Sequence, residues 1–187
     1  LLDIILFITS VAVPPVVSFI NVGQGNLTVI QKEGKVLVYD AGSLNTACLN
    51  SIVQSLWKRG ISQIDQLILS HSDSDHCNLV IPVSRYFPII QIAMSNKTYQ
   101  QLSASLPFKQ VIKCPIQRIH AGDIQIFKDH FYYKVLSPEL YQLEALSDNN
   151  ASLVLKVYLG NFSIALTGDI EQSQINQLSI DSPIVLL

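Results

Sequence analysis

An apolar strand that ends in a cluster of metal-ligating side chains constrains this chain more than any other feature. Residues 67–69 are Leu-Ile-Leu, and two histidines and two aspartates follow within the next seven positions: His71, Asp73, Asp75 and His76. A strand end carries the first of these side chains out of the core, and the turn after it can bring the others to one point. Imidazole nitrogens and carboxylate oxygens suit zinc or manganese, ions that activate bound water. A polar loop that only caps a helix is the alternative, but a cap does not need two histidines.

The size and charge of the chain limit the classes of function. A chain of 187 residues suits one domain with a sizeable core, and 49% of its residues are hydrophobic while 14% are charged. The formal net charge of −2 gives no global attraction to nucleic acid. Lys109, Lys113 and Arg118 are dispersed rather than gathered in a basic run. A contact with DNA would therefore depend on a local patch or on bound metal ions.

Residues 1–15 form an almost wholly apolar lead-in that ends in Pro14 and Pro15. This segment is shorter than the about 20 residues that a helix needs to cross a bilayer, and it lacks the basic start of a signal peptide. Two interpretations stay open. The segment is either the end of a transmembrane helix of a longer protein or a buried first strand. In both cases we expect residues 16–187 to form the folded domain.

The pattern of apolar residues and turn residues predicts strands and helices in alternation. We expect strands at 16–20, 27–31, 35–39, 66–70, 89–94, 111–113, 117–119, 124–128, 132–136, 152–159, 162–167 and 184–187. We expect helices at 45–59, 79–86, 97–105 and 170–178. Strands dominate each half, with helices between them. This order predicts an α+β fold in the form of a layered αββα sandwich.

Four segments of the chain together resemble a known family. HSDSDH at 71–76 is similar to the HxHxDH motif of the metallo-β-lactamase superfamily, in the HxDxDH form of ComEC-type DNA internalisation competence proteins. The other segments have the same order and spacing as the VGQGD, DTG, NxSLVL and LTGD elements of those proteins: VGQG at 22–25, DAG at 40–42, and NNASLVL at 149–155 with LTGD at 166–169. The resemblance runs from about Ser18 to the last residue. It implies a metallo-β-lactamase-like sandwich for this chain.

The resemblance also implies roles for five side chains. His71 and Asp73 would hold one divalent ion, and Asp75 and His76 would hold a second. Asp169 would bridge the two ions. Asp73 stands where most of the superfamily has a histidine, and its harder oxygen donor shifts the preference modestly from Zn²⁺ toward Mn²⁺. Asp75 is the expected catalytic residue, because it can also orient the attacking water.

Three further residues are expected to support the ligands. Asp40 resembles a carboxylate that orients a ligand imidazole, and a turn-forming aspartate at a strand end is the alternative. Asn26 stands where the family's VGQGD element has a carboxylate. Asn150, beside Asn149, stands where other members have a ligand histidine. The chain ends at Leu187, where the family continues into a histidine-bearing loop, so we expect a C-terminally truncated sandwich whose second metal site is incomplete.

The ligand cluster predicts a metal-dependent hydrolase, and the resemblance implies that it is of the phosphodiesterase or nuclease kind, in a DNA-uptake competence protein. By resemblance it would act on the single DNA strand that is not imported in natural transformation. It would work beside the membrane channel domain of the same longer protein, on the outer face of the bacterial inner membrane. No small organic cofactor is expected. The alternatives are a hydrolase of small phosphodiesters or lactams on the same fold, and a catalytically impaired remnant.

Overall fold

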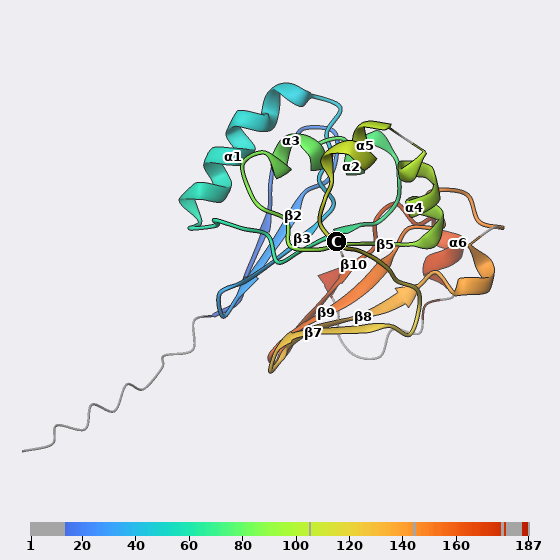
Figure 1. Cartoon of the computed structure of the whole chain (residues 1–187). Helices are drawn as coiled ribbons and strands as arrows, with labels where there is room; N and C mark the ends of the chain where they lie inside the picture. Colours follow the sequence, from blue (N-terminus) through green and yellow to red (C-terminus); the bar gives the residue numbers. More distant parts are fainter. Residues whose placement is uncertain (1–13, 105, 144, 177, 179–184, 187) are drawn as a thin grey trace, which may run out of the picture.

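The computed structural model describes residues 14–104, 106–143, 145–176, 178 and 185–186. These residues form two β-sheets that lie face to face, and helices cover the outer face of the first sheet (Figure 1). The layered α+β arrangement that the sequence predicts is therefore present.

The first sheet contains the chain's first six strands in sequence order. They are β1 (Val16–Phe19), β2 (Thr28–Lys32), β3 (Lys35–Tyr39), β4 (Gln66–Leu69), β5 (Ile92–Met94) and β6 (Ile116–Arg118). β1, β2 and β3 are antiparallel neighbours, whereas β3 to β6 run parallel. Parallel strands need crossover connections, and these bring the helices over one face. Because their carboxyl ends meet at one edge, β4 delivers the histidine-rich loop to that edge.

The second sheet has the strand order β11–β10–β9–β8–β7. Its strands are β7 (Ile124–Lys128), β8 (Phe131–Ser137), β9 (Val154–Leu159), β10 (Phe162–Leu166) and β11 (Val185–Leu186). All neighbours are antiparallel except β10 and β11, which are parallel. The hairpin of β9 and β10 that the sequence predicts is confirmed.

Two apolar cores hold the layers together. The first lies between the helices and the first sheet and includes Val38 and Leu67, whereas the second lies between the two sheets and includes Leu37 and Ile68. Successive residues of a strand point to opposite faces, so neighbours in β3 and β4 enter different cores. Both faces of these central strands are buried. This explains why the sequence shows a continuous apolar run at 67–69 rather than an alternating one.

The helices are η1 (Thr46–Cys48), α1 (Leu49–Lys58), α2 (Ser74–Cys77), α3 (Val80–Ser84), α4 (Asn96–Ser103), α5 (Leu106–Val111), η2 (Leu140–Gln142) and α6 (Gln172–Ile175). The predicted helix at 45–59 is present as η1 and α1, with Ile52, Val53 and Leu56 buried on its inner side. The predicted helices at 79–86, 97–105 and 170–178 correspond to α3, α4 and the shorter α6. The sequence did not predict α2, which carries half of the metal-binding motif.

The strand predicted at Val111–Lys113 is wrong. Val111 is instead the last residue of α5. Phe108 of α5 packs into the first core, and the backbone N–H of Ile112, just after the helix, donates to the carbonyl oxygen of Phe108 at 3.0 Å, so that Ile112 packs into the same core. Pro107 is tolerated because it lies in the first turn. The short β-branched run was therefore outweighed by helical packing against the sheet.

The predicted lead-in at 1–15 and the last strand at 184–187 are only partly covered. Residues 1–13, 184 and 187 lie outside the described residues, and the described part of the last strand is β11. Among the described residues, no helix has the length and apolar character needed to span a membrane.

Candidate metal centre

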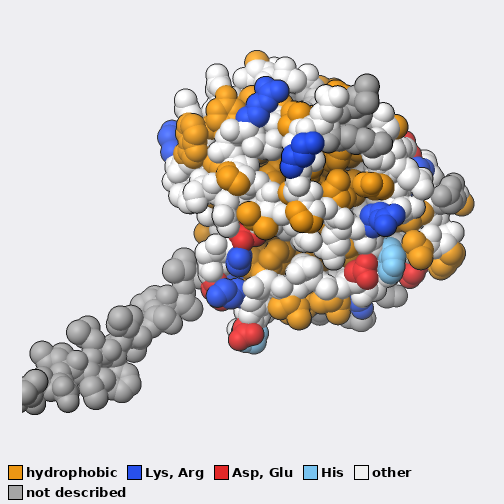
Figure 2. Space-filling view, in the orientation of Figure 1, with side chains coloured by type: hydrophobic (Ala, Val, Ile, Leu, Met, Phe, Trp, Pro, Cys, Tyr) orange, Lys and Arg blue, Asp and Glu red, His pale blue; other side chains and the backbone are white. Residues whose placement is uncertain are grey.

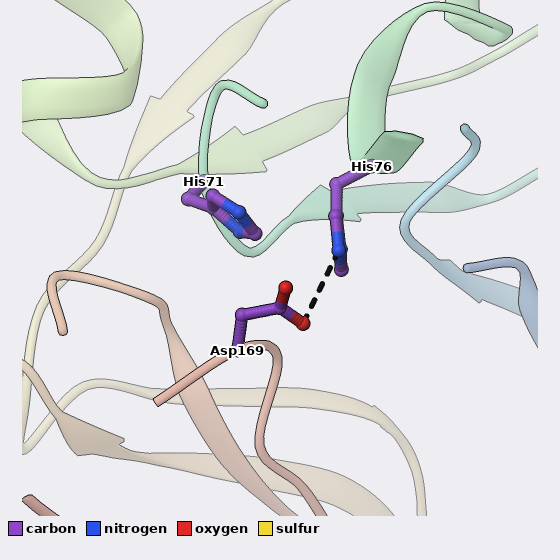
Figure 3. A group of neighbouring side chains, drawn as sticks. All are labelled: His71, His76 and Asp169. Carbon is purple, nitrogen blue, oxygen red and sulfur yellow. Dashed lines mark ion pairs between the residues drawn. The ribbon is translucent and has the colours of Figure 1, made fainter. Parts of the chain in front are cut away.

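Three side chains from distant parts of the sequence meet where β4 and β10 end. His71 follows β4, His76 lies in α2, and Asp169 follows β10. One ligand atom from each lies within 4.8 Å of the others. Figure 3 shows the two imidazoles and the carboxylate converging on one point between the sheets. The two histidines are buried, whereas the Asp169 side chain is 45% exposed, so the cluster is open to solvent on one side.

The ring of His76 is fixed from both ends. Its Nδ1 lies 2.8 Å from Asp40 Oδ2, and its Nε2 lies 3.2 Å from Asp169 Oδ1. Burial alone lowers the pKa of His76, but the hydrogen bond and charge of Asp40, together with nearby aspartates, raise it above its ordinary value. Donation from Nδ1–H to Asp40 leaves Nε2 as the nitrogen that faces Asp169, where it would bind a metal ion in place of a proton. This is the orientation that a metal-ligating imidazole requires.

His71 is oriented by two serine hydroxyl groups. Its Nδ1 lies 2.9 Å from Ser70 Oγ and 3.3 Å from Ser152 Oγ. Its Nε2 is buried and has no hydrogen-bond partner among the described residues. An unsatisfied buried nitrogen costs about 1–3 kcal/mol, whereas a cation bound there would satisfy it. The residues present therefore fit a divalent cation, because a buried imidazole nitrogen without a hydrogen bond belongs to a residue that clusters with a second imidazole and a carboxylate.

Asp40 lies at the centre of the supporting network, and it is fully buried. Its Oδ1 accepts a hydrogen bond from the backbone N–H of Ser70 at 2.7 Å, and its Oδ2 accepts one from Ser70 Oγ at 2.9 Å. Asn26 Nδ2 also donates to Oδ2, at 3.1 Å. Asn26 thus contributes a donor at the position where the family's VGQGD element has an acidic residue. Ser70 connects the two histidine rings through Asp40, since its Oγ contacts both His71 Nδ1 and Asp40.

The two aspartates of the motif lie on different sides of the cluster. Asp73 Oδ2 is 3.5 Å from His71 Nε2, and its side chain is 47% exposed. Asp75, in the first turn of α2, lines a cavity of about 380 Å³ together with His76 and Asp169. The structure thus places Asp73 beside Nε2 of His71, and Asp75 among the residues that line the cavity with the other two candidate ligands. Neither belongs to the tight three-residue cluster.

Asn150 does not contact the ligands in the described structure but supports the segment that carries one of them. Its Oδ1 accepts a hydrogen bond from the backbone N–H of Glu171, and its Nδ2 donates to Glu171 Oε2, both at 3.0 Å. Glu171 is two residues beyond Asp169. The amide of Asn150 therefore fixes the turn after β10 on which Asp169 sits.

Two glycines allow the loops of the site to pack together. A Cβ atom on Gly42 would lie 2.2 Å from the carbonyl carbon of Asp75, and one on Gly25 would lie 2.8 Å from the Asp75 carbonyl oxygen. The backbone N–H of Asn26 donates to that oxygen at 3.0 Å. The VGQG and DAG segments therefore enclose the first turn of α2, and only glycine leaves room for this contact.

Ser70 and Ser152 are the functional residues that sequence reasoning missed. Ser70 directly precedes His71, and Ser152 lies within the NNASLVL segment. Ser152 Oγ also accepts a hydrogen bond from the backbone N–H of Asp169 at 3.3 Å, so it contacts two ligand residues. The available signal was the position of both serines inside segments that already matched the family.

A family model described as the metallo-β-lactamase superfamily matches residues 20–106. Relatives of the ComEC type align along most of the chain. The chain is 30% identical over 159 residues to Recombination protein 2 of Haemophilus influenzae, and this alignment covers 83% of the chain and 18% of that protein. The chain is 26% identical over 174 residues to ComE operon protein 3 of Bacillus subtilis, and that alignment covers 83% of the chain and 22% of the relative. Over residues 20–106 the chain is thus similar to the metallo-β-lactamase superfamily, and along most of its length it is similar to competence proteins of the ComEC type. It spans about a fifth of the length of the curated relatives that it matches.

Solved structures confirm the predicted fold of this superfamily. A metallo-β-lactamase with the HARLDQ motif from Cronobacter sakazakii aligns with a TM-score of 0.59 at 13% identity, over 83% of this chain and 58% of that one. Zn²⁺-bound PqqB from Methylobacterium extorquens aligns with a TM-score of 0.58 at 12% identity, over 75% of this chain and 51% of that one. The superfamily's fold implies binding of divalent metal, and the cluster of His71, His76 and Asp169 provides candidate ligands for it.

Proposed function

We propose that this chain is a metal-dependent phosphodiesterase domain that cleaves single-stranded DNA as part of a competence protein. The observation that supports this most strongly is Nε2 of His71, which is buried, lacks a hydrogen-bond partner among the described residues, and lies 3.5 Å from Asp73 Oδ2 in a residue that clusters with His76 and Asp169. A cation bound there would satisfy this nitrogen, and the neighbouring His76 and Asp169 line the cavity of about 380 Å³.

The donor set indicates which residues would hold divalent ions. His71, His76 and Asp169 would supply the central ligands, with Asp73 on the His71 side and Asp75 on the cavity side. When bound, a pair of Zn²⁺ or Mn²⁺ ions supplies a nucleophilic hydroxide at neutral pH and stabilises the charge of a phosphodiester under attack. The mixture of two imidazoles with three carboxylates suits either metal.

The chain's own residues would contribute orientation and proton transfer. Asp40 holds the His76 ring through Nδ1, and Ser70 and Ser152 hold the His71 ring through its Nδ1. Asp75 is one of the residues that line the cavity, and its carboxylate would accept a hydrogen bond from the attacking water and take its proton. Restricting both rings in advance lowers the entropic cost of assembling the site.

The names of the relatives support DNA as the substrate, whereas the charge distribution gives no attraction to DNA of its own. Two of the relatives are named as a competence protein and a recombination protein, and DNA uptake joins these activities. The net charge is −2, and the lysines and arginines visible on the face in Figure 2 are dispersed over it. Recognition of the phosphate backbone would therefore depend mainly on the bound cations. Within the longer protein, the domain would act on the non-imported strand at the outer face of the membrane.

Cleavage assays with the purified chain test this function. We expect 5′-labelled single-stranded DNA to be cut when Mn²⁺ or Zn²⁺ is added and to stay intact with EDTA. Asp75→Asn should lower the rate by at least about 100-fold, because it removes the group that takes a proton from water. Asp129→Asn is the matched control, since Asp129 is an exposed aspartate in the turn between β7 and β8.

Metal analysis separates the alternatives. Cleavage of small phosphodiesters or lactams without cleavage of DNA would indicate a different hydrolase on this fold. Fewer than one tightly bound ion per chain at equilibrium would indicate a non-catalytic remnant. Metal binding with no cleavage of any DNA substrate would contradict the proposed function.

A further inference from the structure

Phe19 is an exposed aromatic residue at the edge of the candidate site. It is the last residue of β1, the edge strand of the first sheet, and its side chain is 54% exposed. It pairs with Thr28 of β2, which in turn pairs with Tyr39 of β3. Paired residues in neighbouring strands point to the same face of a sheet. Since Tyr39 is buried between the two sheets, the ring of Phe19 also faces the space between them, at its open side.

The same cavity contains both Phe19 and the metal-binding cluster. Phe19 lines one wall of the cavity of about 380 Å³, and Asp75, His76 and Asp169 line another part of it. This volume lies within the about 300–1,000 Å³ that is typical of small-molecule sites. Thr28 and Tyr39, which pair with Phe19 across β2 and β3, are 2% and 1% exposed. Of these three residues only Phe19 therefore presents its side chain to the solvent beside the candidate ligands.

We infer that Phe19 stacks on a nucleobase next to the phosphate held at the metal centre, so that it sets the preference for single-stranded polynucleotides. This inference rests on the proposed function. Every base has a π-face, so an aromatic platform binds single strands with little dependence on sequence. In a duplex the bases are already stacked on one another, and a ring at the cavity wall cannot reach their faces. Phe19 is therefore a specificity-determining residue, whereas the phosphate alone would be recognised equally in any phosphodiester.

The test compares two strands of equal length and charge that differ only in their bases. One is oligothymidylate, and the other carries an abasic tetrahydrofuran unit at every position. For the wild-type chain with Mn²⁺ we expect kcat/KM to be about tenfold higher for oligothymidylate, which corresponds to one stacked base. F19A should lower the value for oligothymidylate to that for the abasic strand and leave the abasic value unchanged. F19W should keep the difference.

Two further variants control for effects on folding. F162A removes another exposed phenylalanine, 71% exposed at the far end of β10 and outside the cavity, and should leave both values unchanged. F19L keeps apolar bulk without an aromatic ring, so it tests stacking even if F19A fails to fold. The inference is overturned if F19L cleaves oligothymidylate as well as the wild type does, or if both strands lose activity equally.

Binding without catalysis separates this inference from the proposed function. Fluorescence anisotropy of the labelled strands with Mn²⁺-loaded protein in the Asp75→Asn background, where cleavage is slow, should show tighter binding of oligothymidylate by the chain with Phe19 and by F162A but not by F19L. Base-dependent binding without cleavage would reject the phosphodiesterase activity alone. Cleavage without base dependence would reject the role of Phe19 alone. If the chain shows neither base-dependent binding nor cleavage, both the proposed function and the role of Phe19 are rejected.

Discussion

Asp40 orients much of the site through one buried carboxylate. It accepts hydrogen bonds from the backbone and hydroxyl of Ser70, from the amide of Asn26 and from His76. Its backbone adopts a left-handed conformation with φ of 59°, which few residue types other than glycine, asparagine and aspartate adopt readily. The sequence suggested both an orienting carboxylate and an ordinary turn aspartate for this position. In the structure the turn conformation and the contact with His76 Nδ1 occur together.

Asp40→Asn should weaken metal binding about 10- to 100-fold, the range found for residues that orient metal ligands. Asparagine tolerates the same backbone conformation, but its uncharged amide holds His76 less firmly and turns an N–H₂ group toward other donors. The measurement is competition with a chromophoric chelator. Asp65→Asn is the matched control, because Asp65 is a nearly buried carboxylate that accepts from the backbone of Val36 and pairs with Lys35. Equal metal affinity in both variants would contradict an orienting role for Asp40.

At the level of elements, the site depends on loops that pack backbone against backbone. The loops after β1 and β3 enclose the start of α2, with hydrogen bonds from Asn26 and Ala41 to the carbonyl groups of Asp75 and His76. Sequence patterns located β4 and its loop correctly, because the apolar run and the ligands are contiguous there. They did not reveal α2, since a helix of four residues is too short to show a period.

Gly42→Ala should lower the free energy of unfolding by more than about 3 kcal/mol. An added methyl group in a packed core usually costs about 1–3 kcal/mol, and here it would meet backbone atoms that cannot move away. The new Cβ would lie 2.2 Å from the carbonyl carbon of Asp75, and neither backbone can move without breaking hydrogen bonds. Gly34→Ala is the control. Gly34 has a φ of +76° but open space around it, so only the backbone strain of about 1–2 kcal/mol applies. Urea denaturation in EDTA measures the free energy of unfolding of both variants. An equal decrease in both would show that the loop around Gly42 moves to accommodate the added methyl group, and would contradict the prediction.

At the scale of the whole molecule, the candidate ligands come from both sheets. His71 and His76 follow β4 of the first sheet, and Asp169 follows β10 of the second. Local patterns in the sequence predicted most strands of both sheets, and the resemblance to the family motifs gave the candidate ligands. They could not show that Ser152 reaches His71, since this contact joins residues 81 positions apart. The error at Val111 has the same origin, because α5 is stabilised by Phe108 packing against a distant core.

A cation bound by residues of both sheets should stabilise the sandwich as a unit. A metal at 100 times its Kd adds about 2.7 kcal/mol to the free energy of unfolding, which corresponds to a rise in Tm of about 5–10 °C for a chain of this size. Asp169→Ala should abolish most of this rise, because it removes the ligand from the second sheet. In EDTA its Tm should stay close to that of the wild type, since the Asp169 side chain is 45% exposed. Asp129→Ala should keep the full rise. If Asp169→Ala keeps it too, the metal binds to the first sheet alone, and the site between the sheets inferred from the cluster does not exist.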